Sequence, residues 1–141
     1  MKLSSPSIRV ALAALFFLVL VLMSGCKPQS VSADPVVRGA HLVTKVAMCQ
    51  DCHSPRLADG QFDPENWLAG SPLGFQPLME MPWSPVAPPI AGLPTLTDEE
   101  AFTFLTTGAL PEGRRPLPPM PEYRFAPDEA NDVIAYLKSL E

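Results

Sequence analysis

The pattern of apolar and polar positions divides the chain into an apolar run near its start, three stretches with helical spacing and an irregular middle. The apolar run extends from Val10 to Met23 and is preceded by Lys2 and Arg9. It is shorter than the roughly 20 residues that a helix needs to cross a bilayer. A basic start followed by a short apolar run is typical of a secretory signal peptide, and we expect this one to occupy residues 1–25.

Helical spacing of apolar residues predicts helices over residues 34–48, 97–108 and 127–140. The first opens with Asp34 and Pro35, an N-cap followed by proline at the first helical position. The second opens with a capping box formed by Thr97 and Glu100, and Gly108 is placed to end it. The third carries the clearest apolar stripe. The sequence contains no convincing strand pattern, so we predict an all-α chain.

Residues 54–96 show no periodic pattern, and most of the chain's 18 prolines lie there or between residues 111 and 121. Proline fixes φ and lacks the amide hydrogen, so these segments are poorly suited to regular helices or sheets. Long loops without secondary structure are uncommon in compact domains. Such a loop becomes reasonable if it wraps a large rigid ligand whose apolar faces supply the missing core.

The chain carries a formal charge of −5, and loss of Lys2 and Arg9 with the signal peptide would make it −7. An acidic chain of this kind argues against binding to nucleic acid and against electrostatic binding to anionic lipid. The charge instead favours a protein partner with a positive docking face.

The sequence CQDCH at positions 49–53 is the C-x-x-C-H pattern of covalent c-type haem attachment. One helical turn separates the two thiols, so each reaches a different vinyl group of the porphyrin, and the histidine that follows ligates the iron. A thioredoxin-like redox pair would need a βαβ pattern, and a zinc site would need ligands beyond His41 and Cys26. We therefore predict one haem c, held by Cys49 and Cys52, with His53 as an iron ligand.

Met120, in the sequence LPPMP at positions 117–121, is the predicted sixth ligand of the iron. Thioether sulfur is a soft ligand, and His/Met ligation raises the reduction potential. The flanking prolines restrict the backbone, so the sulfur should keep its position in both oxidation states. Met79 and Met81 also lie among prolines but are more typical of gap-filling side chains. His41, on the helix that leads into the haem motif, would approach from the wrong side.

The sequence MSGC at positions 23–26 resembles the lipobox of bacterial lipoproteins, in which the cysteine is acylated and becomes the new N-terminus. The resemblance implies that Cys26 is lipidated and that the mature chain is held on the periplasmic side of a bacterial membrane. An uncleaved anchor, or cleavage without lipidation, is the alternative. We predict a lipidated tether over residues 26–33 and a monohaem cytochrome c domain over residues 34–141.

Together these motifs resemble those of the class I c-type cytochromes, and most closely the small cytochrome subunits of bacterial membrane-bound dehydrogenases and respiratory complexes. The resemblance covers about residues 35–140. It rests on Gly39, CQDCH at 49–53, LTDEE at 96–100, Gly108, PEGR at 111–114, PMP at 119–121 and IAYL at 134–137. One departure is residues 80–94, where a proline-rich segment replaces the asparagine-containing loop of many relatives.

The resemblance implies an all-α class I cytochrome c fold, in which short helices and proline-rich loops wrap one covalent haem. It also implies Met120 as the axial ligand and a crossing of the first and last helices, with Gly39 close to Tyr136. Because residues 80–94 differ from the relatives, the resemblance does not assign the residues that line the haem edge there.

The sequence leaves three functions to weigh: electron transfer, haem-based sensing or catalysis, and a purely structural role. A six-coordinate haem without a substrate pocket implies electron transfer, whereas a haem sensor or haem enzyme needs an open sixth position and usually a polar distal group. A purely structural lipoprotein would have no use for the haem motif. We expect a membrane-tethered cytochrome that passes single electrons between a dehydrogenase or respiratory complex and another redox partner. It would have no catalytic residue and no small-molecule substrate.

Haem propionates need hydrogen-bond donors, and five side chains qualify by type: Trp67, Trp83, Arg114, Arg115 and Tyr123. For each of these five residues, a role in packing or an exposed position is an equally good interpretation. The second ring nitrogen of His53 usually bonds a backbone carbonyl, and the sequence does not identify it.

Overall fold

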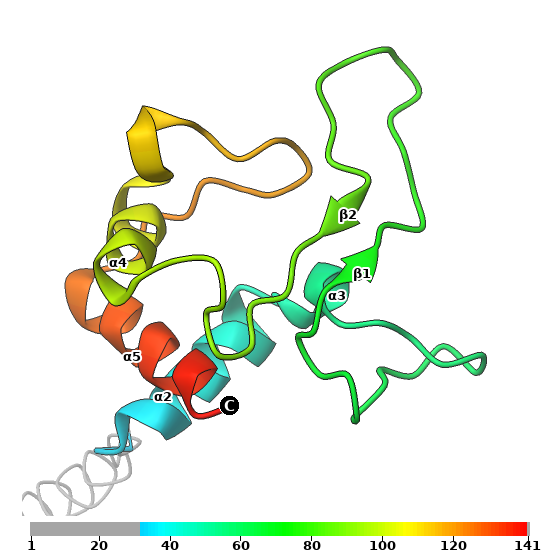
Figure 1. Cartoon of the computed structure of the whole chain (residues 1–141). Coiled ribbons are helices and arrows are strands. Elements are labelled where there is room, and N and C mark those ends of the chain that lie inside the picture. Colours follow the sequence, from blue (N-terminus) through cyan, green and yellow to red (C-terminus); the bar gives the residue numbers. More distant parts are fainter. Residues whose placement is uncertain (1–31, 141) are drawn as a thin grey trace, which may run out of the picture. The chain divides into compact units, whose positions relative to one another are not determined.

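The computed structural model describes residues 32–140, and the predicted signal peptide and Cys26 lie outside these residues. The described part is mostly helical, as predicted (Figure 1). No helix within it is long and apolar enough to cross a membrane. Its elements are α2 (Pro35–His41), η1 (Leu42–Val46), α3 (Gln50–His53), β1 (Ser71–Pro72), β2 (Val86–Ala87), α4 (Asp98–Thr107), η2 (Pro111–Gly113) and α5 (Pro127–Lys138).

The first helix begins as predicted but ends its α-helical part earlier. The carboxylate of Asp34 accepts from the amide of Val36 at 2.9 Å, which is the expected N-cap. The α-helix ends at His41, and the chain continues as the π-helical turn η1 rather than as α-helix to Met48. Met48 itself has a φ of +51°, a left-handed conformation that ends the helical run before the haem motif.

The two later helices have the predicted ends. In α4, Thr97 and Glu100 form both hydrogen bonds of the capping box. Gly108 has a φ of +71° and caps the other end of α4, a conformation that glycine adopts without a steric penalty. In α5, the carboxylate of Glu129 accepts from the amide of Ala126 at 2.9 Å, which satisfies a donor at the start of the helix.

A close crossing of α2 and α5 organises the helices (Figure 1). A Cβ atom added to Gly39 would lie 2.6 Å from the carbonyl carbon of Asp132 and 2.8 Å from Cβ of Tyr136. The contact expected between Gly39 and Tyr136 is therefore confirmed. Only a residue without a side chain allows the two backbones to approach this closely.

A partly buried ion pair joins the same two helices. Nε and Nη2 of Arg38 donate to the two carboxylate oxygens of Asp132 at 2.7 and 2.6 Å, a bidentate arrangement. Nη1 of Arg38 donates to the carbonyl oxygens of Ser32 and Ala33 at 3.0 and 2.8 Å. The last two residues of the predicted tether, Ser32 and Ala33, are therefore fastened to α2.

The core lies where α5 meets α4 and the segment between α2 and α3. The stripe predicted on α5 is buried, and Leu68 and Val43 are the largest side chains that are fully buried. Leu68 belongs to the irregular middle, which therefore contributes to the core in addition to the helices. The buried apolar residues of this core are Val43, Leu68, Ala101, Phe104, Leu105, Ala130, Val133, Ile134 and Leu137.

The prediction that the chain lacks strands is wrong for one short hairpin. Ser71 pairs with Ala87 and Pro72 with Val86 in an antiparallel ladder between β1 and β2. Strands of two residues are too short to produce an alternating pattern, which explains why the sequence did not reveal them. The loop that joins them projects away from the helices (Figure 1).

The α2–α5 crossing predicts that Gly39→Ala destabilises the protein, although alanine is the better helix former by about 1 kcal/mol. The added methyl group would meet the backbone of Asp132, which cannot rotate away. Such overpacking typically costs about 1–3 kcal/mol. Denaturant titration measures the free energy of unfolding. Gly74→Ala is the matched control, because a Cβ atom there meets nothing within 4 Å. Equal stability of the two variants would contradict the close crossing.

Candidate functional site

The two cysteines and the histidine of the CQDCH sequence lie on one turn of helix, as their spacing predicted. The amide of His53 donates to the carbonyl oxygen of Cys49 at 2.9 Å, which closes α3. The amide of Cys49 donates to the carbonyl oxygen of Val43 at 2.9 Å, so η1 fixes where this turn begins. Cys49 and Cys52 are free thiols and are both partly buried.

The two thiols differ in their surroundings. Burial raises the pKa of Cys49 to about 11. Cys52 is more accessible, and its pKa is raised mainly by burial and to a lesser extent by the charge of Asp51. Both groups are therefore protonated thiols near neutral pH. Neither has the lowered pKa that marks a reactive thiolate, which argues against a thioredoxin-like redox pair.

The ring of His53 is buried and oriented by one hydrogen bond. Its Nδ1 lies 2.7 Å from the carbonyl oxygen of Pro88. A carbonyl only accepts, so Nδ1 carries the hydrogen. Burial lowers the pKa of His53, so the ring is neutral near pH 7 and Nε2 bears the lone pair. This is the tautomer and orientation of a metal-ligating histidine.

Two segments of the irregular middle hold the Pro88 carbonyl against His53. The amide of Gly70 donates to the carbonyl oxygen of His53 at 2.8 Å, and Gly70 has a φ of +87°. A Cβ atom on Gly70 would lie 2.8 Å from the nitrogen of Pro89 and 2.9 Å from the carbonyl oxygen of Ala87. Gly70 therefore lets the 87–89 segment come close enough to reach the imidazole.

Ser54, next to the histidine, connects the same two segments through a buried hydrogen bond. Its buried hydroxyl oxygen accepts from the amide of Leu68 at 2.8 Å. The carbonyl oxygen of Leu68 in turn accepts from the amides of Ile90 and Ala91 at 2.9 and 3.2 Å. The proline-rich segment 80–94 therefore contains the carbonyl that orients His53.

Met120 is half-buried and packs against the apolar core. Its amide donates to the carbonyl oxygen of Leu117 at 3.2 Å. The amide of Ser84 donates to the carbonyl oxygen of Pro118 at 2.8 Å, so the loop between β1 and β2 is bonded to the segment that carries Met120. The same loop leads into β2 and then to Pro88 beside His53.

The other candidate ligands have different environments. Met79 and Met81 are 77% and 44% exposed, so neither fills a gap in the core. His41, at the end of α2, is exposed. Among the thioethers considered for the sixth position, Met120 alone is partly enclosed by the core.

Of the five donors considered for propionates, three already have protein partners. Nε1 of Trp67 donates to the hydroxyl of Tyr136 at 3.0 Å. The hydroxyl of Tyr123 donates to the carbonyl oxygen of Ala47 at 2.9 Å, and burial raises its pKa to about 12, so it stays a donor. Arg115 bonds Thr107 and Glu122.

The remaining two donors differ in burial. Arg114 is exposed. Nε1 of Trp83 is buried and has no hydrogen-bond partner, while its ring contacts Phe75 edge-on at 5.6 Å between centroids. A buried donor without an acceptor is costly, so an acceptor group bonded to Trp83 would be favourable.

No three His, Cys, Asp or Glu side chains come together as a metal-binding cluster within residues 32–140. The potential ligating groups on the CQDCH turn itself are the imidazole of His53 and the thiols of Cys49 and Cys52.

Sequence reasoning missed Ser54, Gly70 and Pro88, which position the histidine. The carbonyl of Pro88 carries no side-chain signal, because every residue has a carbonyl. Gly70, between two predicted loop segments, offered only the general hint that glycine marks a close approach of backbone.

No protein-family model matches the chain, and a search of curated proteins finds no match either.

Proposed function

We propose that this chain is a monohaem c-type cytochrome of the class I fold, which transfers single electrons and is not itself an enzyme. Haem c, when bound, supplies the one-electron chemistry of its iron. Cys49 and Cys52 would form its thioether links, and His53 and Met120 would be its axial ligands. The observation that carries the proposal is the buried imidazole of His53 beside two free thiols, oriented by the Pro88 carbonyl.

The hydrogen bond from Nδ1 supports a ligand role because it leaves Nε2 with its lone pair. It also increases the electron density on the ring, which strengthens a bond to iron. A catalytic base would instead need access to a substrate proton, and His53 is only 5% exposed.

The surroundings of Met120 and Trp83 fit the same group. A half-buried thioether in a proline-flanked segment suits a soft axial ligand whose position should not change with oxidation state. The unpaired Nε1 of Trp83 would find its acceptor in a propionate. A sensor or haem enzyme would need an open sixth position, which a thioether fixed in this way opposes.

The length of the tether favours electron transfer to a partner that is held in the same membrane. Because Arg38 holds Ser32 and Ala33, the chain between a lipidated Cys26 and Ser32 spans at most about 20 Å even when fully extended. A haem domain on so short a connection stays close to the periplasmic face of its membrane. We therefore propose a membrane-bound dehydrogenase or respiratory complex as its neighbour, which would dock through a positively charged face on this acidic chain.

The axial assignment predicts that Met120→Ala removes the weak far-red absorption band of a sulfur–iron bond while the haem stays covalently attached. The reduction potential should fall, because His/Met ligation raises it, and the ferrous iron should bind carbon monoxide. Absorption spectroscopy and redox titration measure these changes. Met79→Ala is the matched control, since that thioether is 77% exposed.

If Met120→Ala keeps the band and the potential of the wild type, Met120 is not the ligand. If Met79→Ala loses the band instead, the ligand lies in the loop between β1 and β2.

The lipid tether predicts that Cys26→Ser releases a soluble protein that still carries haem. The haem motif and the lipidated residue are separate, so attachment should be unaffected while electron flux to the membrane partner falls. The wild type and Cys26→Ser are expressed in the same host. Membrane fractionation and haem staining then show where each protein is and whether it carries haem. Retention of the variant in salt-washed membranes would contradict lipidation, and full electron flux from the released protein would contradict a fixed neighbour.

A further inference from the structure

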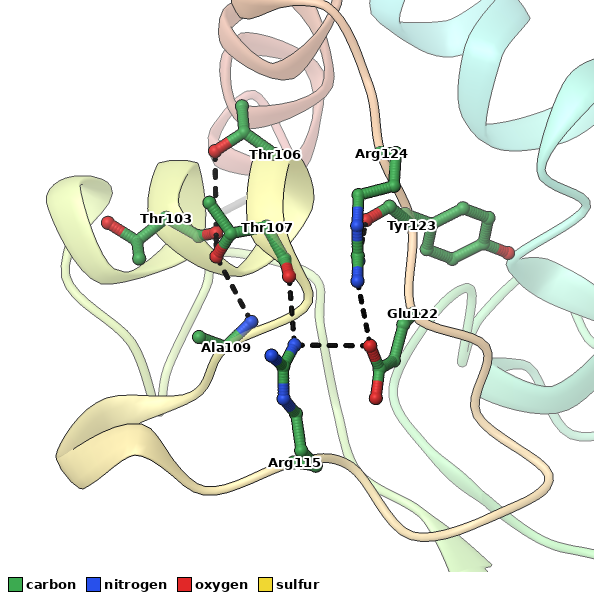
Figure 2. A network of polar contacts seen from close by, with 8 residues as sticks. All are labelled: Thr103, Thr106, Thr107, Ala109, Arg115, Glu122, Tyr123 and Arg124. Atoms are coloured by element: carbon green, nitrogen blue, oxygen red, sulfur yellow. Dashed lines mark hydrogen bonds and ion pairs between the residues drawn. The ribbon is translucent and has the colours of Figure 1, made fainter.

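A group of charged side chains lies at the base of the segment that carries Met120 (Figure 2). Nη1 of Arg115 donates to Oε2 of Glu122 at 3.1 Å. The same oxygen accepts from Nη2 of Arg124 at 2.8 Å. Arg115 precedes Met120 in the chain, and Glu122 and Arg124 follow it. One carboxylate oxygen therefore binds cationic groups from both sides of the methionine.

The contact between Arg115 and Glu122 closes the intervening residues into a loop that contains Met120. Its base is attached to the end of α4, because Nη1 of Arg115 also donates to the carbonyl oxygen of Thr107 at 2.9 Å. A cation is favourable there, since the end of a helix carries partial negative charge. A Cβ atom on Gly108 would lie 2.8 Å from Cβ of Glu122, so Glu122 packs directly on the helix cap.

The end of α4 is a firm attachment point. The hydroxyl of Thr107 donates to the carbonyl oxygen of Thr103 at 2.6 Å and accepts from the amide of Ala109 at 3.2 Å. The hydroxyl of Thr106 donates to the carbonyl oxygen of Phe102 at 2.8 Å. Figure 2 shows Arg115 between Thr107 and Glu122. The loop is thus joined to a helix end whose threonine hydroxyls are hydrogen-bonded within the helix.

The other side of the loop is attached to the haem motif. The hydroxyl of Tyr123 donates to the carbonyl oxygen of Ala47, two residues before Cys49. The ring of Tyr123 stacks on Phe125 at 5.1 Å between centroids, and the amide of Phe125 donates to the carbonyl oxygen of Leu105 in α4 at 3.0 Å. Glu122 is therefore adjacent to the residue that joins the two halves of the site.

We propose that Glu122 is a positioning residue that keeps the sulfur of Met120 on the iron by closing this loop. The role rests on the proposed ligation of iron by Met120. With the loop open, the sulfur would occupy its ligand position for a smaller fraction of the time. An external ligand would then compete more successfully for the iron. Because exposed ion pairs add little to global stability, the effect should be on ligation and not on unfolding.

The test uses the full-length holoprotein with Glu122→Gln, which removes the charge and keeps the size of the side chain. The affinity of the ferrous protein for carbon monoxide should rise roughly three- to tenfold, the range for loss of one or two exposed charged pairs. The far-red band should weaken in proportion. Arg115→Gln, which removes one of the two cationic partners of Glu122, should raise the affinity in the same direction. The double variant should add little to Glu122→Gln, because the two substitutions remove the same contact.

The matched control is Asp98→Asn, which breaks another exposed ion pair, with Lys138 at 2.9 Å, at the opposite end of α4. Its carbon monoxide affinity should equal that of the wild type. Wild-type affinity in Glu122→Gln, or an equal rise in Asp98→Asn, would overturn the positioning role. Met120→Ala separates the two proposals. If this variant retains the far-red band, the assignment of Met120 as the ligand fails. If it loses the band while Glu122→Gln keeps the carbon monoxide affinity of the wild type, only the role of Glu122 is refuted.

Discussion

The backbone contact between Gly39 and Asp132 sets the distance between α2 and α5, and both η1 and α4 pack against these two helices. The haem motif follows from the carboxyl end of the α2–η1 run, and the segment of Met120 leads into the start of α5. The bidentate pair between Arg38 and Asp132 crosses the same contact. A change in this spacing would therefore move the two proposed axial ligands relative to each other.

The irregular middle has a defined task despite its lack of long elements. It returns to His53 twice, through the amide of Gly70 and through the carbonyl of Pro88. Prolines suit this task because their φ is already fixed, so ordering them costs less conformational entropy. Since the loop between β1 and β2 also bonds the carbonyl of Pro118, one continuous stretch of chain connects the surroundings of the proposed proximal and distal ligands.

Local sequence patterns predicted what depends on neighbouring residues and missed what depends on distant ones. The one distant contact that was expected, between Gly39 and Tyr136, came from the family resemblance. The caps at Asp34, Thr97 and Gly108 carry local side-chain signals and were found within their predicted helices. The carbonyl of Pro88 and the pair formed by Arg115 and Glu122 depend on tertiary contacts, which no local pattern encodes. The CQDCH spacing put both thiols and the histidine on one turn, but haem attachment, lipidation and electron transfer remain predictions.

Mass spectrometry of the mature protein tests the central claim most directly. The chain should be exported by a host that attaches c-type haem, purified and then denatured. We expect the intact mass to include one haem that survives denaturation, and a proteolytic fragment spanning residues 49–53 to carry it, because thioether bonds do not depend on the fold. A mature chain whose mass does not include haem, or haem that acid acetone extracts, would contradict the account.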